Sequence, residues 1–165
     1  MTDKCQCPPE AGAATCELSS AFPSVSCPAC QRAGKPVTGL ALKALLSLPL
    51  TEVRAVEYRF CRTPDCLVVY YSVDGHQQFG EDVLRELVHQ KHPAEDDVFV
   101  CYCFRHTPRS IKVELATAGQ STVIADITAG IQAGQCACDI RNPQGSCCLG
   151  NVRALVDKLT REVRG

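Results

Sequence analysis

The stretch VFVCYCFRHTPRSI, residues 98–111, joins an apolar run to a helix start and carries two cysteines one residue apart. Cys101 and Cys103 alternate with aromatic residues, as in an extended segment that faces a core. Thr107 followed by Pro108 is typical of a helix N-cap with proline at the first helical position. The stretch therefore predicts an extended arm that bends and enters a helix, with two thiols just before that helix.

The cysteine content of the chain is unusually high, with 13 cysteines in 165 residues. Such a density is typical of disulfide scaffolds or of metal-binding proteins. The N-terminal sequence has neither the basic segment nor the apolar segment of a secretory signal, and no later apolar run reaches membrane-spanning length. We therefore expect a cytoplasmic protein without membrane insertion. Since thiols stay reduced there and an odd number cannot pair completely, metal ligation is favoured over disulfides.

The charge balance and the motifs exclude several classes of function. Lys and Arg number 17 against 18 Asp and Glu, so the basic stripe of a nucleic-acid-binding protein is not indicated. The sequence contains no P-loop, no Rossmann glycine pattern and no convincing pair of nucleophile and base. We therefore expect a protein that is not an enzyme in the usual sense and that does not bind nucleic acid.

Three regions are predicted from local composition. Residues 1–22 are rich in Ala, Ser, Pro and Cys without periodicity, which indicates a flexible tail with unligated thiols. The polar, proline-containing segment 91–97 is the predicted domain boundary. The expected division is a first unit at 23–95 followed by a second, helical unit at 96–165.

Periodicity predicts an α+β fold. In the first unit, leucines over 40–48 indicate a short helix ended by proline, and two Val- and aromatic-rich strands over 55–61 and 67–75 indicate a hairpin. A helix is also expected over 80–91. The second unit is predicted to be helical, with helices beginning at Pro108 and spanning 121–131 and 148–163. The first unit is thus a small zinc-ribbon-like combination of hairpin and helix.

Two cysteine pairs in the first unit have the spacing of zinc knuckles: Cys27 with Cys30, and Cys61 with Cys66. Four thiolates brought together by two such turns form the closed tetrahedral shell of structural zinc. Asp65 is an alternative to Cys61, because zinc also accepts carboxylate oxygen.

Six more cysteines follow residue 100, which exceeds the need of one zinc ion: Cys101, Cys103, Cys136, Cys138, Cys147 and Cys148. A 2Fe-2S cluster takes four thiolates, and loops that precede helices offer backbone N–H groups that moderate its negative charge. Cys101 and Cys103 precede one predicted helix. Cys147 and Cys148 lie at the start of another, so a cluster site is expected in the second unit.

A family resemblance rests on these same motifs. The segment VCYCF with TPRSI, followed by ITAGIQAGQCACDIRNPQGSCCLGNVRALV, resembles the bacterioferritin-associated-ferredoxin-like 2Fe-2S fold. Together with CPAC and YRFCRTPDCLVVYYS, it is similar to the N-terminal domain of iron-sulfur CopZ-type copper chaperones. The resemblance covers nearly all of the chain after the tail. It implies one mononuclear zinc and one 2Fe-2S cluster.

The resemblance also assigns the cluster ligands. Cys101 and Cys103 match the first cluster pair of that family. We select Cys138 and Cys148 as the second pair, because adjacent cysteines rarely face one iron and Cys148 lies at a helix N-terminus. The alternates are Cys136 and Cys147, which otherwise serve as small buried residues beside the cluster.

The function implied by the resemblance is electron transfer in support of copper trafficking, in which the cluster takes Cu(II) to Cu(I). Cu⁺ is then a further candidate cofactor. Expected partners are a heavy-metal-associated domain or a copper-transporting ATPase, and homodimer formation is left open. In the family such a domain is fused to a C-terminal heavy-metal domain. This sequence ends at Gly165 without one, so we expect that the domain acts alone or that a further segment is missing. The alternatives are a non-redox zinc-binding docking protein and a regulatory ferredoxin for iron storage or cluster assembly.

Overall fold

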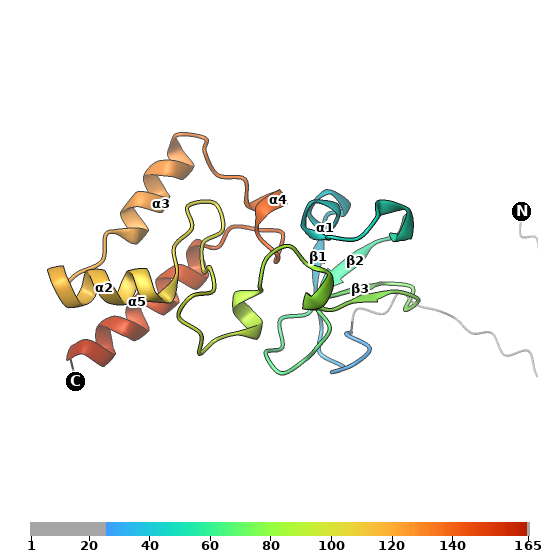
Figure 1. Ribbon diagram of the computed structural model, residues 1–165, viewed down its shortest axis with the longest axis horizontal. Coiled ribbons are helices and arrows are strands. Elements are labelled where there is room, and N and C mark those ends of the chain that lie inside the picture. Colours follow the sequence, from blue (N-terminus) through green and yellow to red (C-terminus); the bar gives the residue numbers. More distant parts are fainter. Residues whose placement is uncertain (1–25, 165) are drawn as a thin grey trace, which may run out of the picture.

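The computed structural model describes residues 26–164 (Figure 1). The predicted tail at 1–22, with its three cysteines, lies outside the described residues. The described part combines a four-stranded antiparallel sheet with helices, so the α+β class is confirmed. In Figure 1 the sheet lies at one end of the molecule, and helices α2, α3 and α5 lie at the other.

The sheet has the strand order β1-β2-β3-β4, and all neighbours are antiparallel. Its strands are β1 Lys35–Val37, β2 Tyr58–Phe60, β3 Tyr70–Ser72 and β4 Gln78–Phe79. The predicted hairpin is confirmed as β2 and β3, in which Tyr58 lies opposite Ser72. The two outer strands escaped prediction because three and two residues are too few to show alternation.

Helix α1, Gly39–Leu45, covers the sheet. It begins after Thr38, whose hydroxyl accepts a hydrogen bond from the Ala41 N–H, as expected of an N-cap. Leu42 and the following Leu46 are buried in one cluster with sheet aromatics, including Phe60. This apolar cluster is the core of the sheet half.

The prediction of a helix over residues 80–91 is wrong. The segment instead forms two short 3-10 helices, η2 Glu81–Val83 and η3 His89–Lys91, separated by extended backbone. The extended part pairs with the end of α1, since the Arg85 N–H donates to the Leu45 carbonyl at 2.9 Å. The Glu81 carboxylate accepts from the Val88 N–H. Tertiary hydrogen bonds thus take the backbone groups that a helix would have used.

The three helices predicted in the second half are confirmed. They are α2 Pro108–Ala118, α3 Val123–Gln132 and α5 Leu149–Arg164. Thr107 and Ser110 form a reciprocal capping box at the start of α2, with Pro108 at the first helical position. Both α2 and α3 pack on α5, and the buried cluster between them includes Ile111 and Val152.

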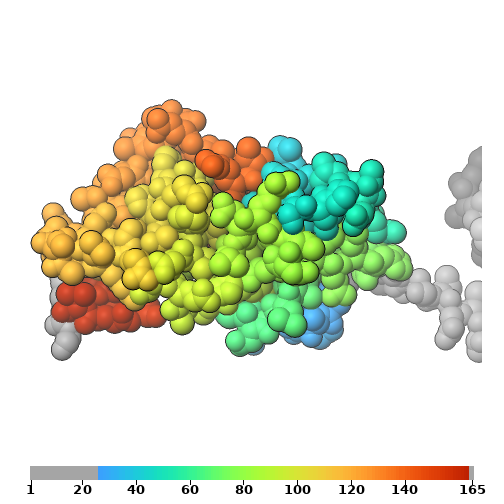
Figure 2. Space-filling model, in the orientation of Figure 1, coloured from blue at the N-terminus to red at the C-terminus, as the bar shows by residue number. Residues whose placement is uncertain are grey.

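A fourth helix, α4 Cys138–Arg141, links the two halves, because it packs against α1 of the sheet half. Its four residues are too few to show a helical period in the sequence. The space-filling view shows the two halves as one continuous body (Figure 2).

Among residues 26–164 no helix has the length and apolar character that a bilayer crossing requires.

Candidate metal centres

The first cysteine pair lies on a tight knuckle. The Gln31 N–H donates to the Cys27 carbonyl, and the Cys27 N–H donates to the Arg32 carbonyl, both at 2.8 Å. Gln31 has a φ of 59°, in the left-handed region, which lets the chain reverse directly after Cys30. The knuckle therefore directs the Cys27 and Cys30 thiols toward the same point.

The second cysteine pair lies on the turn between β2 and β3. The Cys61 N–H donates to the Val69 carbonyl at 2.8 Å, which continues the pairing of the two strands. The Cys66 N–H donates to the Thr63 carbonyl at 3.2 Å and closes the turn. The hairpin thus presents Cys61 and Cys66 to the first knuckle.

Lys91, the last residue of η3, holds the turn that carries Cys61 and Cys66. Its ammonium donates to the carbonyl oxygens of Thr63 at 2.7 Å, Cys66 at 2.8 Å and Val68 at 2.9 Å. Since an ammonium has three N–H donors, all of them are used on one turn. Sequence reasoning missed this role, because nothing in a lone lysine at the start of a polar segment predicts its carbonyl partners.

The four thiols have the spacing of a tetrahedral metal site. The Sγ atoms of the two pairs all lie within 4.8 Å of one another. Cys27 and Cys66 are 3.8 Å apart, and Cys30 and Cys61 are 3.6 Å apart. A zinc ion with Zn–S bonds of about 2.3 Å needs sulfur atoms about 3.8 Å apart. The residues therefore fit zinc.

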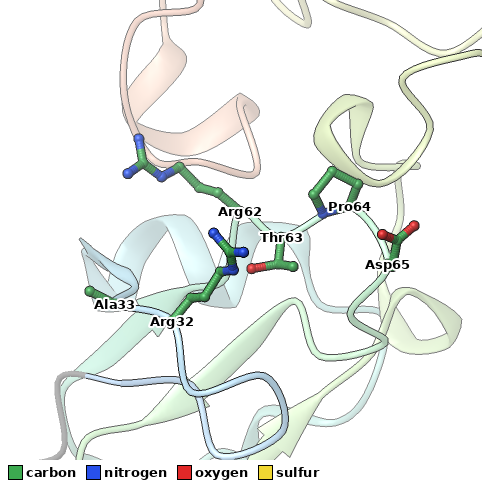
Figure 3. Close-up of a pocket in the computed structure, with 6 residues that line it drawn as sticks. All are labelled: Arg32, Ala33, Arg62, Thr63, Pro64 and Asp65. Carbon is green, nitrogen blue, oxygen red and sulfur yellow. The ribbon is translucent and has the colours of Figure 1, made fainter.

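Asp65, the predicted alternative to Cys61, is not part of this four-thiol group within residues 26–164. It lines an outer hollow of about 560 Å³ together with Arg32, Arg62 and Thr63 (Figure 3). The Thr63 hydroxyl lies 3.3 Å from the Cys30 thiol, so this wall of the hollow supports the four-thiol group from outside.

The protonation of these thiols reflects their crowding. Burial raises the pKa of Cys66 to about 12, and the neighbouring thiols act in the same direction. Burial also opposes ionisation of Cys30, but hydrogen bonds from Thr63, Arg32 and the adjacent thiols lower its pKa to about 6. Four adjacent thiolates repel one another unless a cation compensates them, and a divalent metal provides that charge.

The second cysteine group begins on the arm that precedes α2. Residues 102–105 form a turn closed by the pairing of Cys101 with His106, whose N–H and carbonyl groups exchange two hydrogen bonds of 3.2 Å. Arg105 has a φ of 58° at the turn. The arm therefore bends locally and presents Cys101 in the interior and Cys103 at half-buried depth.

The loop 142–148 delivers Cys148 to the start of α5. Two buried amides organise it: Asn142 donates to the Ser146 carbonyl at 2.7 Å, and Gln144 donates to the Cys147 carbonyl at 2.9 Å. Sequence reasoning missed both residues. The NPQG turn around them was the available signal, since such residues are frequent in turns.

Five of the six later thiols converge. The Cys138 Sγ lies 3.5 Å from those of Cys103 and Cys136, and these three sulfurs lie within 4.8 Å of one another. Cys101, Cys138 and Cys148 are buried in one core cluster, against which Cys103 and Cys136 pack. The neighbouring Cys148 thiol is the main cause that lowers the pKa of Cys101 to about 7 and that of Cys138 to about 5.

The structure thus brings together the four predicted cluster residues, Cys101, Cys103, Cys138 and Cys148, and adds the alternate Cys136. The other alternate, Cys147, is exposed. Four thiolates suffice for a 2Fe-2S cluster, so the donor set fits this group.

Two aromatic residues flank the first cluster thiols and pack on neighbouring elements. The Tyr102 hydroxyl donates to the Leu87 carbonyl at 2.8 Å and accepts from the His89 N–H at 2.9 Å. The Phe104 ring packs against α3 at Gly130. A residue with a Cβ at position 130 would collide with this ring. Their contacts favour a packing role.

Comparison with known proteins identifies the first half. Residues 24–85 match a CopZ family described as a zinc binding domain. Residues 24–85 are thus similar to CopZ-type zinc-binding domains. The match includes all four cysteines of the four-thiol group.

A solved structure resembles a larger part of the chain. The X-ray structure of the Archaeoglobus fulgidus CopZ N-terminal domain superposes with a TM-score of 0.66 and 27% sequence identity. The match covers 79% of this chain and 96% of that one, and so extends beyond the zinc-binding domain. A search of curated proteins gave no significant match.

Proposed function

We propose that this protein is an electron-transfer protein that carries one structural zinc and one 2Fe-2S cluster and supports copper trafficking. Zinc is held by the four-thiol group of the zinc-binding domain. The cluster is held by Cys101, Cys103, Cys138 and Cys148. The convergence of these four thiols in one cluster, at segments that lead into helices or begin them, carries the proposal.

The burial of the cluster thiols is graded, which supports a redox role. Cys101 is 0% and Cys148 is 1% exposed, so these two thiols exclude water from one side. Cys103 is only half-buried, and this side is the shorter route for an electron to a partner. When bound, a 2Fe-2S cluster accepts and donates one electron.

One backbone hydrogen bond acts on this outer side. The Ala137 N–H donates to the Cys103 sulfur at 3.4 Å. Hydrogen bonds to cluster sulfurs stabilise added negative charge, and so they raise the reduction potential. The chain therefore favours the reduced state more than a bare thiolate set would.

The link to copper comes from the resemblance to CopZ-type copper chaperones, which the structural similarity to a CopZ N-terminal domain supports. One electron takes the substrate Cu(II) to Cu(I), the form that thiolates prefer. The proposed acceptor of Cu(I) is a heavy-metal-associated domain or a copper-transporting ATPase in the cytoplasm. Apart from this metal reduction, no enzymatic activity is proposed.

Metal analysis and spectroscopy test the proposal. The protein is purified without oxygen and reconstituted with iron and sulfide. We expect one zinc and two irons per chain, visible charge-transfer absorption, and a paramagnetic resonance signal after dithionite. Added Cu(II) should then be reduced by the cluster, as measured with a Cu(I) chelator. A colourless protein with two zinc ions and no iron would contradict the redox function.

A non-redox docking protein is the second candidate, and one observation favours it. Cys103, Cys136 and Cys138 form a three-thiol group by themselves, and Cys148 contacts it, so these thiols offer a tetrahedral set for a second zinc. The ratio of iron to zinc in the purified protein separates the two functions.

A further inference from the structure

The second cysteine group holds five thiols, one more than a 2Fe-2S cluster takes. Cys101 and Cys148 are fully buried in one core cluster, and we call them the inner pair. The outer trio is Cys103, Cys136 and Cys138, whose sulfurs lie within 4.8 Å of one another. The surplus thiol therefore belongs to the outer trio.

Cys136 and Cys138 differ in burial, since Cys138 is buried and Cys136 is half-buried, but they share a neighbour. They lie 3.5 Å apart, and both lie within 4.8 Å of Cys103. Their segment is anchored behind them, because the Gln135 N–H donates to the Gly130 carbonyl at 2.9 Å. The reversal after α3 that brings Cys136 back uses Gly134 at a φ of 70°, a conformation suited to glycine. The chain thus fixes Cys136 within the outer trio.

We propose that Cys136 and Cys138 exchange as ligands of one iron of the cluster. The inference rests on the proposed function, since it needs the cluster to be present. Each iron of a 2Fe-2S cluster takes two protein ligands. The inner pair serves one iron, and the outer trio offers three thiols for the two places on the other.

The exchange is balanced without an oxidant or reductant. The iron–sulfur bond to Cys138 breaks as the bond to Cys136 forms, and the proton that Cys136 loses passes to the Cys138 sulfur. Their 3.5 Å separation allows this transfer between neighbours. The consequence is a cluster that stays bound when either thiol is modified.

Serine substitutions test the proposal, with Cys147 as the matched control because it is exposed and lies outside the five thiols. In Cys136→Ser the iron content and the reduced-state resonance should equal those of the unmutated protein. Cys138→Ser should keep more than about half of the iron with a shifted spectrum, because Cys136 replaces it. The double variant should hold at least about tenfold less iron, and Cys147→Ser should change nothing.

The outcomes separate this inference from the proposed function. Suppose that Cys138→Ser loses as much iron as the double variant while its zinc content and helical circular dichroism are retained. The inference of ligand exchange is then wrong, whereas the proposed function as a cluster-binding protein is unaffected. If the unmutated protein takes up no iron, both ideas fail.

A second measurement avoids substitution altogether. The unmutated protein loaded with iron and sulfide is given a short anaerobic pulse of iodoacetamide, and the modified peptides are sequenced by mass spectrometry. Exchange predicts that in each chain only one of Cys136 and Cys138 is alkylated, with the label divided between the two, while the exposed Cys147 is fully labelled. Label at Cys136 alone means that Cys138 is a fixed ligand, and it overturns the inference.

Discussion

The Tyr70 hydroxyl donates a hydrogen bond of 2.7 Å to the carbonyl oxygen of Pro143, and thereby joins the sheet of the zinc-binding domain to the loop that carries Cys148. Tyr70 is fully buried in β3, and its burial raises the pKa of the phenol, so the donor stays protonated. The Gln90 amide also donates to Gln144 in the same loop at 2.9 Å. One of the thiols proposed to hold the cluster is therefore positioned partly by the zinc-binding domain.

Replacement of this tyrosine should loosen the cluster loop. In Tyr70→Phe the Pro143 carbonyl loses its buried donor, which costs about 1–3 kcal/mol in the free energy of unfolding. Urea unfolding followed by circular dichroism measures this loss. Cluster release to an iron chelator should become faster, as followed by the visible absorption.

The matched control is Tyr58→Phe, since the Tyr58 hydroxyl bonds only within the zinc-binding domain, to Arg54 and Gln77. This variant should lose stability without faster cluster release. Equal release rates in the two variants would show that the hydrogen bond to Pro143 does not position the loop.

Loss of zinc should unfold the sheet half. Its apolar core is small, so metal binding contributes directly to the free energy of folding. Cys27→Ala removes a ligand that is completely buried, and we expect zinc content to fall below half of the unmutated value together with much of the ordered structure. Zinc analysis and circular dichroism check this, with Cys147→Ala as the control. A Cys27→Ala protein that keeps both its zinc and its spectrum would refute the assignment.

Short-range signals explain which parts of the fold were predictable. The Thr107 and Pro108 start of α2 is a local cap, and it was predicted because the chemistry of a cap lies within four residues. The helix expected over 80–91 failed for the opposite reason. Its backbone pairs with the end of α1, some forty residues earlier, and no local pattern reports that pairing.

The candidate sites were likewise predictable only where the signal is local in the sequence. Spacing indicated the four zinc-site cysteines, because each knuckle is a local turn. Sequence reasoning selected Cys138 over Cys136 without a local signal for the choice, since which thiol faces a metal depends on the loop that follows α3. The structure places both within one group. The hydrogen bonds by which Lys91 and Tyr70 hold the two sites in place could not be predicted, because their acceptors are backbone carbonyls of distant segments.

Removal of the Lys91 ammonium should weaken the second zinc knuckle. Lys91→Met keeps the aliphatic stem and leaves the carbonyls of Thr63, Cys66 and Val68 without their donor. We expect a loss of roughly 2 kcal/mol in unfolding free energy and faster zinc transfer to a chelator. Lys43→Met, at an exposed lysine of α1, is the control and should behave as the unmutated protein. Unchanged zinc transfer in Lys91→Met would mean that the turn holds its shape without the lysine.

The pH dependence of stability should contain a contribution from His92. This half-buried ring bridges Glu81, at 2.7 Å, and Glu95, at 2.8 Å. Burial alone would lower its pKa, but the two carboxylates outweigh burial and raise the pKa of His92 above its ordinary value of about 6.5. A raised pKa means that the folded protein binds this proton more tightly than the unfolded chain does. The stabilisation is therefore complete below about pH 6.5 and is lost as pH rises through the folded-state pKa.

Comparison with His92→Gln isolates this contribution, because the protonation of zinc thiolates affects both proteins alike. The unmutated protein should be more stable by about 1 kcal/mol near pH 5.5, and the difference should shrink near pH 8.5. Urea midpoints at the two pH values measure it. His76→Gln, at an exposed turn, serves as the control and should give a difference close to zero at both. A His92→Gln difference that stays constant or grows with pH would show that the ring acts through packing and not through its charge.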